Sequence, residues 1–231
     1  QESSTDATEK ADEAAADETE ATAEEDESTL PEIKQSMLKP FVESFKPKDG
    51  MHITYTVSTT FLKEDGSEDY VENFSYDTHI KGNTMFQQKT SLDNPNSVLN
   101  STTAIWNGDL VSLDEQTHTG KILMHDTLAS YADDENGILM QAAPYDLIDT
   151  RSYDYDFTVE DREVDGTTYT VEVHPQREDY IPQADFCFDQ DGNVVSIHMH
   201  AIGTDNFHPE QLFTIEAWDK NVDESLLDLY D

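Results

Sequence analysis

The chain has 231 residues, with 51 acidic and 13 basic side chains, so its formal net charge at pH 7 is -38. A field of that sign repels the phosphates of nucleic acids and anionic lipid headgroups, which argues against a polyanion-binding role. The sequence has no run of about 18 apolar residues that would span a membrane, and its single cysteine, Cys187, excludes a disulfide within the chain.

Residues 1–29 predict a disordered acidic tether. The segment consists almost wholly of Glu, Asp, Ala, Thr and Ser, and it holds 12 acidic residues against the single base Lys10. Without aromatic or branched aliphatic residues, it cannot bury enough area to offset the entropy lost on ordering. The chain begins with Gln, which suggests that an upstream segment was removed. Residues 30–231 are long enough for one domain with a substantial core.

The first element predicted after the tether is a short amphipathic helix within residues 30–45. Ile33, Met37, Phe41 and Phe45 follow helical spacing. Pro40 lies among them and is expected to break or kink a single long helix. The helix would pack its apolar side against a sheet.

A meander of strands is predicted from Met51 onward. Apolar and polar residues alternate with a period of two, which gives each strand one apolar face. Turn signals separate the runs, and Asn107-Gly108 is the strongest hairpin dipeptide among them. The predicted strands are residues 51–61, 70–80, 84–88, 102–106, 110–113 and 121–124.

Residues 125–149 differ from the segments around them. They contain many apolar residues but no sustained period of two, which indicates short helices or a flap. A sheet of about ten strands needs cover on its apolar face, so this segment is expected to cross it.

Hairpins resume between Tyr153 and Trp218. Alternation predicts strands in 153–159, 169–173, 186–188, 195–201 and 213–217, with acidic-Gly turns at 163–166 and 189–193. The predicted fold is mainly β with a few helices: a strongly curved, unclosed antiparallel half-barrel of about 10–11 strands, covered by short helices.

Two polar patterns suggest metal sites. His198 and His200 lie two apart on a strand and share a side, where His174 or His208 could join them around a transition metal. Because their parity is opposite to that of Ile197, a solvent-facing position without metal is favoured.

The segment from Asp189 alternates Asp189, Asp191 and Asn193, as in a calcium loop. Val194 and His200 stand where that loop needs Gly and Glu, so a hairpin turn is favoured. The chain also has no Gly-x-Ser-x-Gly elbow, glycine-rich phosphate loop or His-Glu-x-x-His motif. We therefore expect no catalytic residues, no metal and no cofactor.

Four segments taken together resemble the LolA-like and LppX/LprG-like bacterial lipoproteins. They are residues 81–83, 104–113, 164–169 and 188–197, and the resemblance extends over about residues 33–229. The resemblance implies an unclosed curved sheet with helices over its mouth, around an apolar cavity for acyl chains or other lipids. It carries no catalytic residues, and Gram-positive members are commonly lipid-anchored on the outer face of the membrane.

The acidic tether is similar to the stalk of such a surface lipoprotein, whose acylated cysteine would precede residue 1. The alternative is the disordered tail of an intracellular protein. If the chain is such a lipoprotein, an N-terminal lipid anchor absent from this sequence would hold it at the extracellular face of the bacterial cell membrane.

Aromatic residues and one methionine on the predicted strands are candidates for the cavity wall, because acyl chains bind through dry apolar area. Each could instead belong to an ordinary core. The expected function is noncatalytic binding or carriage of a lipid or other apolar small molecule. The alternative is a cell-envelope protein-interaction or glycan-binding module with a solid core. The candidates are Tyr55, Phe61, Phe74, Tyr76, Trp106, Phe157, Tyr169, Phe188, Met199 and Phe213.

Overall fold

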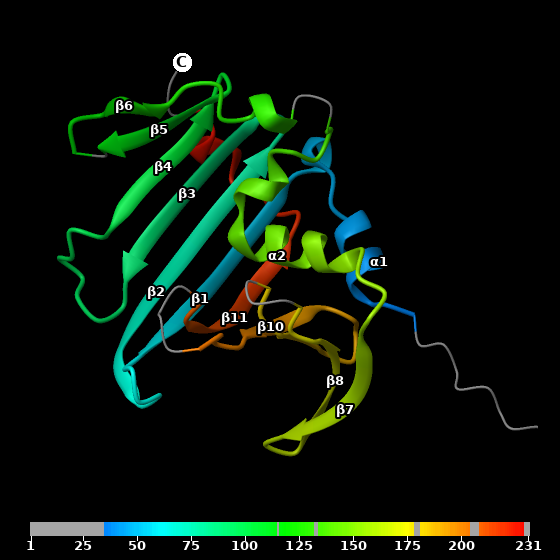
Figure 1. Ribbon diagram of the computed structural model, residues 1–231. Coiled ribbons are helices and arrows are strands. Elements are labelled where there is room, and N and C mark those ends of the chain that lie inside the picture. Colours follow the sequence, from blue (N-terminus) through cyan, green and yellow to red (C-terminus); the bar gives the residue numbers. More distant parts are fainter. Residues whose placement is uncertain (1–34, 115, 132–133, 178–180, 204–207, 229–231) are drawn as a thin grey trace, which may run out of the picture. The chain divides into compact units, whose positions relative to one another are not determined.

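The computed structural model describes residues 35–114, 116–131, 134–177, 181–203 and 208–228. They form an 11-stranded antiparallel sheet with two α-helices and several short 3₁₀-helices (Figure 1). This confirms the predicted fold of a curved, open sheet with few helices. The predicted tether, residues 1–29, lies outside the described residues. Among the described helices, none is long and apolar enough to cross a membrane.

The strand order shows how the chain builds the sheet. The order is β6-β5-β4-β3-β2-β1-β11-β10-β9-β8-β7, so the first strand pairs with the last at the centre. The chain winds from β1 to one edge, crosses back through the helical segment, and returns from the other edge to the centre. The strands are β1 Met51–Leu62, β2 Glu68–Lys81, β3 Thr84–Ser91, β4 Ser101–Trp106, β5 Asp109–Asp114, β6 Thr119–Met124, β7 Thr158–Val164, β8 Thr167–His174, β9 Ala184–Phe188, β10 Val194–Met199 and β11 Glu210–Asp219.

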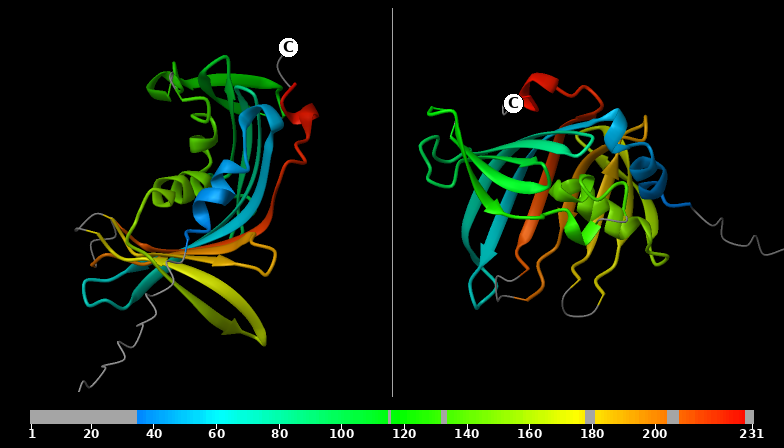
Figure 2. Two further views of the ribbon diagram at one scale, coloured as in Figure 1. Left: turned by 90° about the vertical axis from the view of Figure 1, so that its right-hand side faces the viewer. Right: turned by 90° about the horizontal axis from the view of Figure 1, so that it is seen from above.

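Helices α1, η3 and α2 lie within the bend of the sheet, on its concave side, whereas η5 lies on the convex side (Figure 2). The predicted helical crossing is confirmed and extends three residues beyond the predicted segment, to Ser152. The helices are α1 Leu38–Glu43, η1 Pro47–Asp49, η2 Ala129–Tyr131, η3 Leu139–Gln141, α2 Ala143–Ser152 and η5 Glu224–Leu226.

Pro40 does not interrupt helix α1. The helix begins at Leu38, so Pro40 lies in its first turn. Backbone N–H groups in the first turn have no intrahelical acceptor, and the missing N–H of proline therefore costs nothing there. The helix has six residues.

The strand predicted from Tyr153 was wrong over its first five residues. β7 begins at Thr158, and Tyr153 is the residue that caps α2. The side chain of Arg151 is buried, lies 3.5 Å from Asp154 Oδ2, and donates to the carbonyl of Pro182. These contacts hold the segment after α2 against the end of the sheet, in a conformation that is not extended.

The main core lies between the concave face and the helices. Burial alternates along β1 as the period of two requires, with the side chains of Met51, Ile53 and Tyr55 turned inward. A second, smaller cluster lies on the convex face. There Phe86, Ala104, Val111 and Leu113 pack against Leu226 and Leu227 after the last strand.

Candidate functional site: a cavity under helix α2

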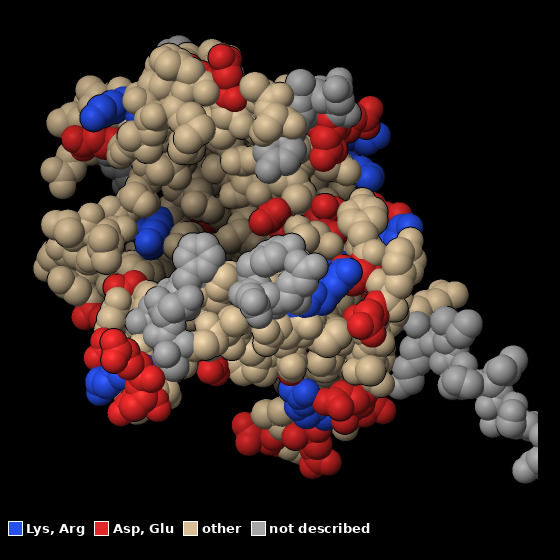
Figure 3. Space-filling view, viewed as in Figure 1, with Lys and Arg blue, Asp and Glu red and all other residues tan. Residues whose placement is uncertain are grey.

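The concave face of the sheet and the helical segment over it, which we call the cover (η3 and α2), are not in contact everywhere. A cavity of about 370 Å³ lies between the concave faces of β1, β2, β3 and β11 and the segment formed by η3 and α2. The space-filling view shows the molecule hollowed beside this cover (Figure 3). The lining residues are Tyr55, Val57, Tyr76, Gln87, Gln141, Ala143, Asp146, Leu147, Gln211 and Phe213.

Aromatic rings form the floor of the cavity. Tyr55 and Tyr76 are direct partners across β1 and β2, and their rings stack with centroids 4.8 Å apart and an interplanar angle of 4°. Phe213 on β11 lies on the other side of Tyr55, with ring centroids 5.9 Å apart. Burial raises the pKa of both tyrosines. The floor is therefore uncharged over the whole physiological pH range.

Polar groups line the remaining wall of the cavity. Gln87 Nε2 lies 3.1 Å from Thr78 Oγ1, and Gln211 Nε2 lies 3.4 Å from Thr59 Oγ1, so both amides are positioned by a hydroxyl on a neighbouring strand. From above, α2 contributes Asp146, which lies in its first turn. Burial raises the pKa of this carboxyl.

The concave face changes character beyond Tyr76. The register places Lys89 opposite Tyr76, Ser101 opposite Lys89, and Thr103 opposite Gln87. All five side chains are therefore on the concave face. Lys89 Nζ lies 3.9 Å from the centroid of the Phe74 ring. The cavity thus has an aromatic floor toward β1 and β11. Beyond the cavity, toward β3 and β4, the concave face becomes polar and carries the ammonium of Lys89.

The predicted cavity residues occupy three kinds of position. Tyr55, Tyr76 and Phe213 line the cavity. Phe74, Phe188 and Met199 lie on the same face but are buried in the packed core. The other predicted residues lie elsewhere.

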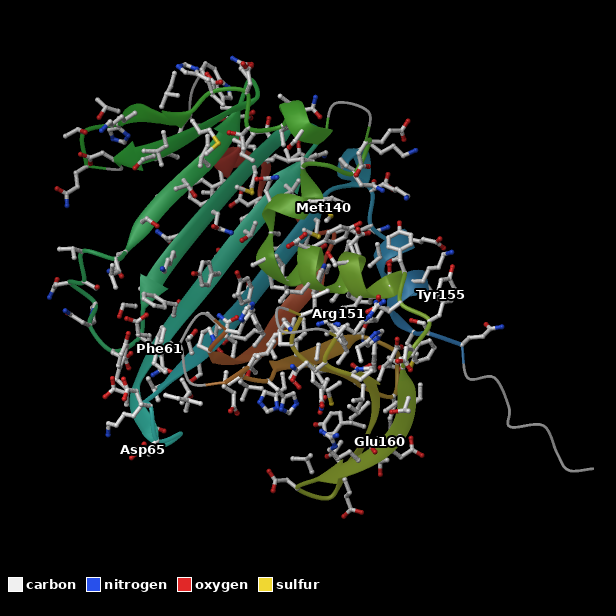
Figure 4. All side chains as sticks on the ribbon, viewed as in Figure 1. Phe61, Asp65, Met140, Arg151, Tyr155 and Glu160 are labelled. Carbon is white, nitrogen blue, oxygen red and sulfur yellow. The ribbon has the colours of Figure 1, made fainter. Side chains whose placement is uncertain are left out.

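Phe61 is also on the concave face but does not line the cavity. Its ring stacks on Tyr70 with centroids 4.5 Å apart. Phe61 is near the tip of the β1–β2 hairpin, close to Asp65 and away from Met140 in the cover (Figure 4).

Phe157, Trp106 and Tyr169 do not line the cavity. Phe157 precedes β7, and its ring stacks on His174 at 5.6 Å. Trp106 is next to Ile105 on β4, and Tyr169 is next to Thr170 on β8. Ile105 and Thr170 face the concave side, so Trp106 and Tyr169 face the convex side.

Seven lining residues were absent from the sequence-based set. Val57 has the parity of Tyr55, and that signal could have found it. Gln87 and Gln211 also follow strand parity, but polar residues were not considered for an apolar wall. Nothing in the local pattern locates the four residues contributed by the cover: Gln141, Ala143, Asp146 and Leu147.

No family model and no curated protein matches the chain, and the solved structures that are similar to it share little sequence. An uncharacterized conserved protein from Thermus thermophilus is 9% identical, with a TM-score of 0.41 over 84% of this chain and 94% of that chain. MucB is 11% identical, with a TM-score of 0.40 over 82% of this chain and 60% of that chain.

A putative outer membrane lipoprotein-sorting protein domain from Vibrio parahaemolyticus is 12% identical, with a TM-score of 0.30 over 79% of this chain and 90% of that chain. These likenesses concern the arrangement of the backbone and assign no function.

Proposed function

We propose that this chain is a noncatalytic, surface-anchored bacterial lipoprotein of the LolA-like kind, which binds or carries a lipid or other hydrophobic ligand. The single observation that supports this most is the cavity of about 370 Å³ under α2. Ligand sites in proteins have volumes of about 300–1,000 Å³ and combine apolar walls with a few polar groups. The cavity is at the lower end of that range, which suits one small amphiphile or one acyl chain.

The two walls of the cavity indicate how such a ligand would lie. Its apolar part would contact Tyr55 and Phe213, where burial of apolar area contributes about 25 cal/mol per Å². Its polar end would face Gln87 on β3 or Asp146 on α2, which line the cavity. Lys89 lies beyond them on the same face of β3. This arrangement favours binding over chemistry, because the described lining offers an acid without a neighbouring nucleophile.

Anchoring at the membrane is the second part of the proposal. The acidic N-terminal segment has the composition of a solvated spacer, and residues 30–231 would be held by it at the extracellular face. Strong negative charge on the folded part would keep the domain from lying flat on anionic headgroups.

Filling the cavity mouth tests the ligand proposal. Ala143 lines the cavity, yet its side chain is exposed, so Ala143→Trp adds a large ring there without disturbing the core. We expect a dansyl-labelled fatty acid to bind the unaltered protein saturably, and Ala143→Trp to weaken that binding by about tenfold or more, which is about 1.4 kcal/mol. Fluorescence titration measures both affinities.

The matched control is Thr150→Trp, at an exposed position of the same helix outside the cavity. It should leave the affinity unchanged. Equal affinities for Ala143→Trp and the unaltered protein, or no saturable binding to either, would speak against the cavity as the ligand site.

One observation favours a second candidate, an envelope protein-interaction module. β6 is an edge of the sheet, and its apolar residues Ile122, Leu123 and Met124 are all exposed. An unpaired edge of this kind can accept an extended segment of a partner protein as an additional strand. Absence of fatty-acid binding in the titration above would leave this candidate as the better account.

A further inference from the structure

A second cluster of chemically active side chains lies on the convex face, away from the cavity. Asp185, His198 and His200 each offer one ligand atom, and these atoms lie within 4.8 Å of one another. Asp185 is the direct partner of His198 across β9 and β10, and His200 follows two residues later on the same side. Strand pairing therefore fixes the spacing of the three side chains.

The geometry leaves the cluster open to solvent on one side. Asp185 Oδ1 lies 3.3 Å from His200 Nε2, and the two imidazole rings have centroids 4.0 Å apart. The side chain of Asp185 is only 8% exposed, whereas those of His198 and His200 are 32% and 36% exposed. A fourth group comes from β11, where Glu210 Oε1 lies 2.9 Å from His198 Nε2.

Neighbouring groups orient the carboxylate of Asp185. Both terminal nitrogens of Arg162 lie 3.3 Å from Asp185 Oδ2, which leaves Oδ1 facing the imidazoles. Gln183 Nε2 donates to Oδ1 at 2.9 Å and lies 3.3 Å from His200 Nε2. Metal ligands in proteins are typically held in this way by a surrounding set of hydrogen bonds.

A comparable cluster on the same face has one histidine without a nitrogen that is free to bind a metal ion. His52, Asp77 and His79 also have ligand atoms within 4.8 Å of one another. However, His79 Nδ1 accepts the backbone N–H of Asp223 at 3.2 Å. In the neutral ring the proton is then on Nε2, which lies 3.2 Å from Asp77 Oδ1. That nitrogen has no lone pair for a metal ion, so the cluster is a hydrogen-bonded group.

We propose that Asp185, His198 and His200 form a binding site for a divalent transition-metal ion such as Zn²⁺, with Glu210 as the fourth ligand. Two imidazole nitrogens with carboxylate oxygens are a donor set that suits zinc, and four-coordinate zinc accepts them tetrahedrally. Two carboxylates balance the charge of the ion. The formal net charge of -38 raises the local concentration of cations around the protein.

This proposal departs from the sequence-based expectation of no metal, because pairing of β9 with β10 adds an acid that sequence spacing did not indicate. Bound metal would link β9, β10 and β11 on the convex face. It would therefore stabilise the part of the sheet that carries Phe213.

Titration of the metal-free protein with Co²⁺ tests the site, because cobalt in a tetrahedral site of nitrogen and oxygen ligands absorbs visible light. We expect saturation at one equivalent, displacement by Zn²⁺, and a higher melting temperature with Zn²⁺ than with chelator. His200→Gln should weaken cobalt binding by about tenfold or more. It should also abolish the rise in melting temperature.

The matched control is His52→Gln, which removes one histidine of the other convex cluster. It should leave cobalt affinity and the zinc effect unchanged. If His200→Gln does not fold, His198→Gln takes its place, because that ring is also partly exposed. The proposal is overturned if the unaltered protein shows no saturable binding, or if His52→Gln loses binding and the variants of the proposed site keep it.

Discussion

Replacing Glu172 by alanine is expected to lower the free energy of unfolding by about 3–5 kcal/mol, because one partner of a buried charged network is removed. The Glu172 side chain is fully buried on β8. Its two oxygens accept from Ser36 Oγ and from the backbone N–H of Met37, each at 2.7 Å. His174 Nε2 lies 2.8 Å from the same carboxylate. Without it, the buried His174 and the half-buried Ser36 hydroxyl and Met37 N–H lose this partner.

Urea unfolding measures this loss, and Glu216→Ala on β11 is the control. Glu216 is exposed, so its replacement should change the unfolding free energy by less than about 0.5 kcal/mol. Since Glu172 ties the start of α1 to the sheet, hydrogen exchange in α1 should also become faster in Glu172→Ala. Equal unfolding free energies for the two variants would contradict the role given to this carboxylate.

Gly50→Ala is expected to cause the second large loss of stability. Gly50 has φ 85° and ψ 159°, a region that only glycine adopts readily, and other residues pay about 1–3 kcal/mol there. A Cβ at this position would also lie 2.6 Å from Val222 Cγ2 and 3.5 Å from the carbonyl oxygen of Ile80. Overpacking of this kind adds about 1–3 kcal/mol.

Gly66→Ala separates the cost of backbone strain from the cost of overpacking. Gly66 has φ 81°, and a Cβ there would meet no heavy atom within 4 Å, so this variant carries the backbone cost without the contact. Thermal or urea unfolding should place Gly50→Ala clearly below Gly66→Ala in stability. Similar values for both would show that the segment around Val222 moves aside freely.

Much of the fold could be predicted because the information is local. Alternation of apolar residues marked the strands, and turns such as Asn107-Gly108 set the order of the hairpins. Pairing of β1 with β11 could not be predicted this way, since it joins residues at least 150 positions apart in the sequence. The residue at which β7 begins could not be predicted either, because it depends on the contacts of Arg151 with Asp154 and Pro182.

The cavity could be predicted only in part, for two physical reasons. Strand parity puts Tyr55 and Phe213 on the concave face, but the position of α2 decides whether a concave residue lines the cavity or packs into the core. Parity itself is ambiguous where polar residues are buried. On β8 the concave face carries Glu172 and His174, because they serve the buried network, so Tyr169 lies on the convex side.

Trp106 illustrates the same ambiguity in an apolar run. Ala104, Ile105 and Trp106 are all apolar, so the sequence does not say which of the two faces each residue takes. Pairing of Ile105 with Met85 settles the parity, and the Trp106 side chain is 42% exposed.

Mass spectrometry of lipids extracted from the purified protein tests the central claim most directly. The account predicts that one class of amphiphile recurs in every preparation, near one molecule per chain, and that Ala143→Trp purified in parallel carries much less of it. Preparations of the unaltered protein without any amphiphile, or with an amount that Ala143→Trp does not change, would contradict the cavity under α2 as a ligand site.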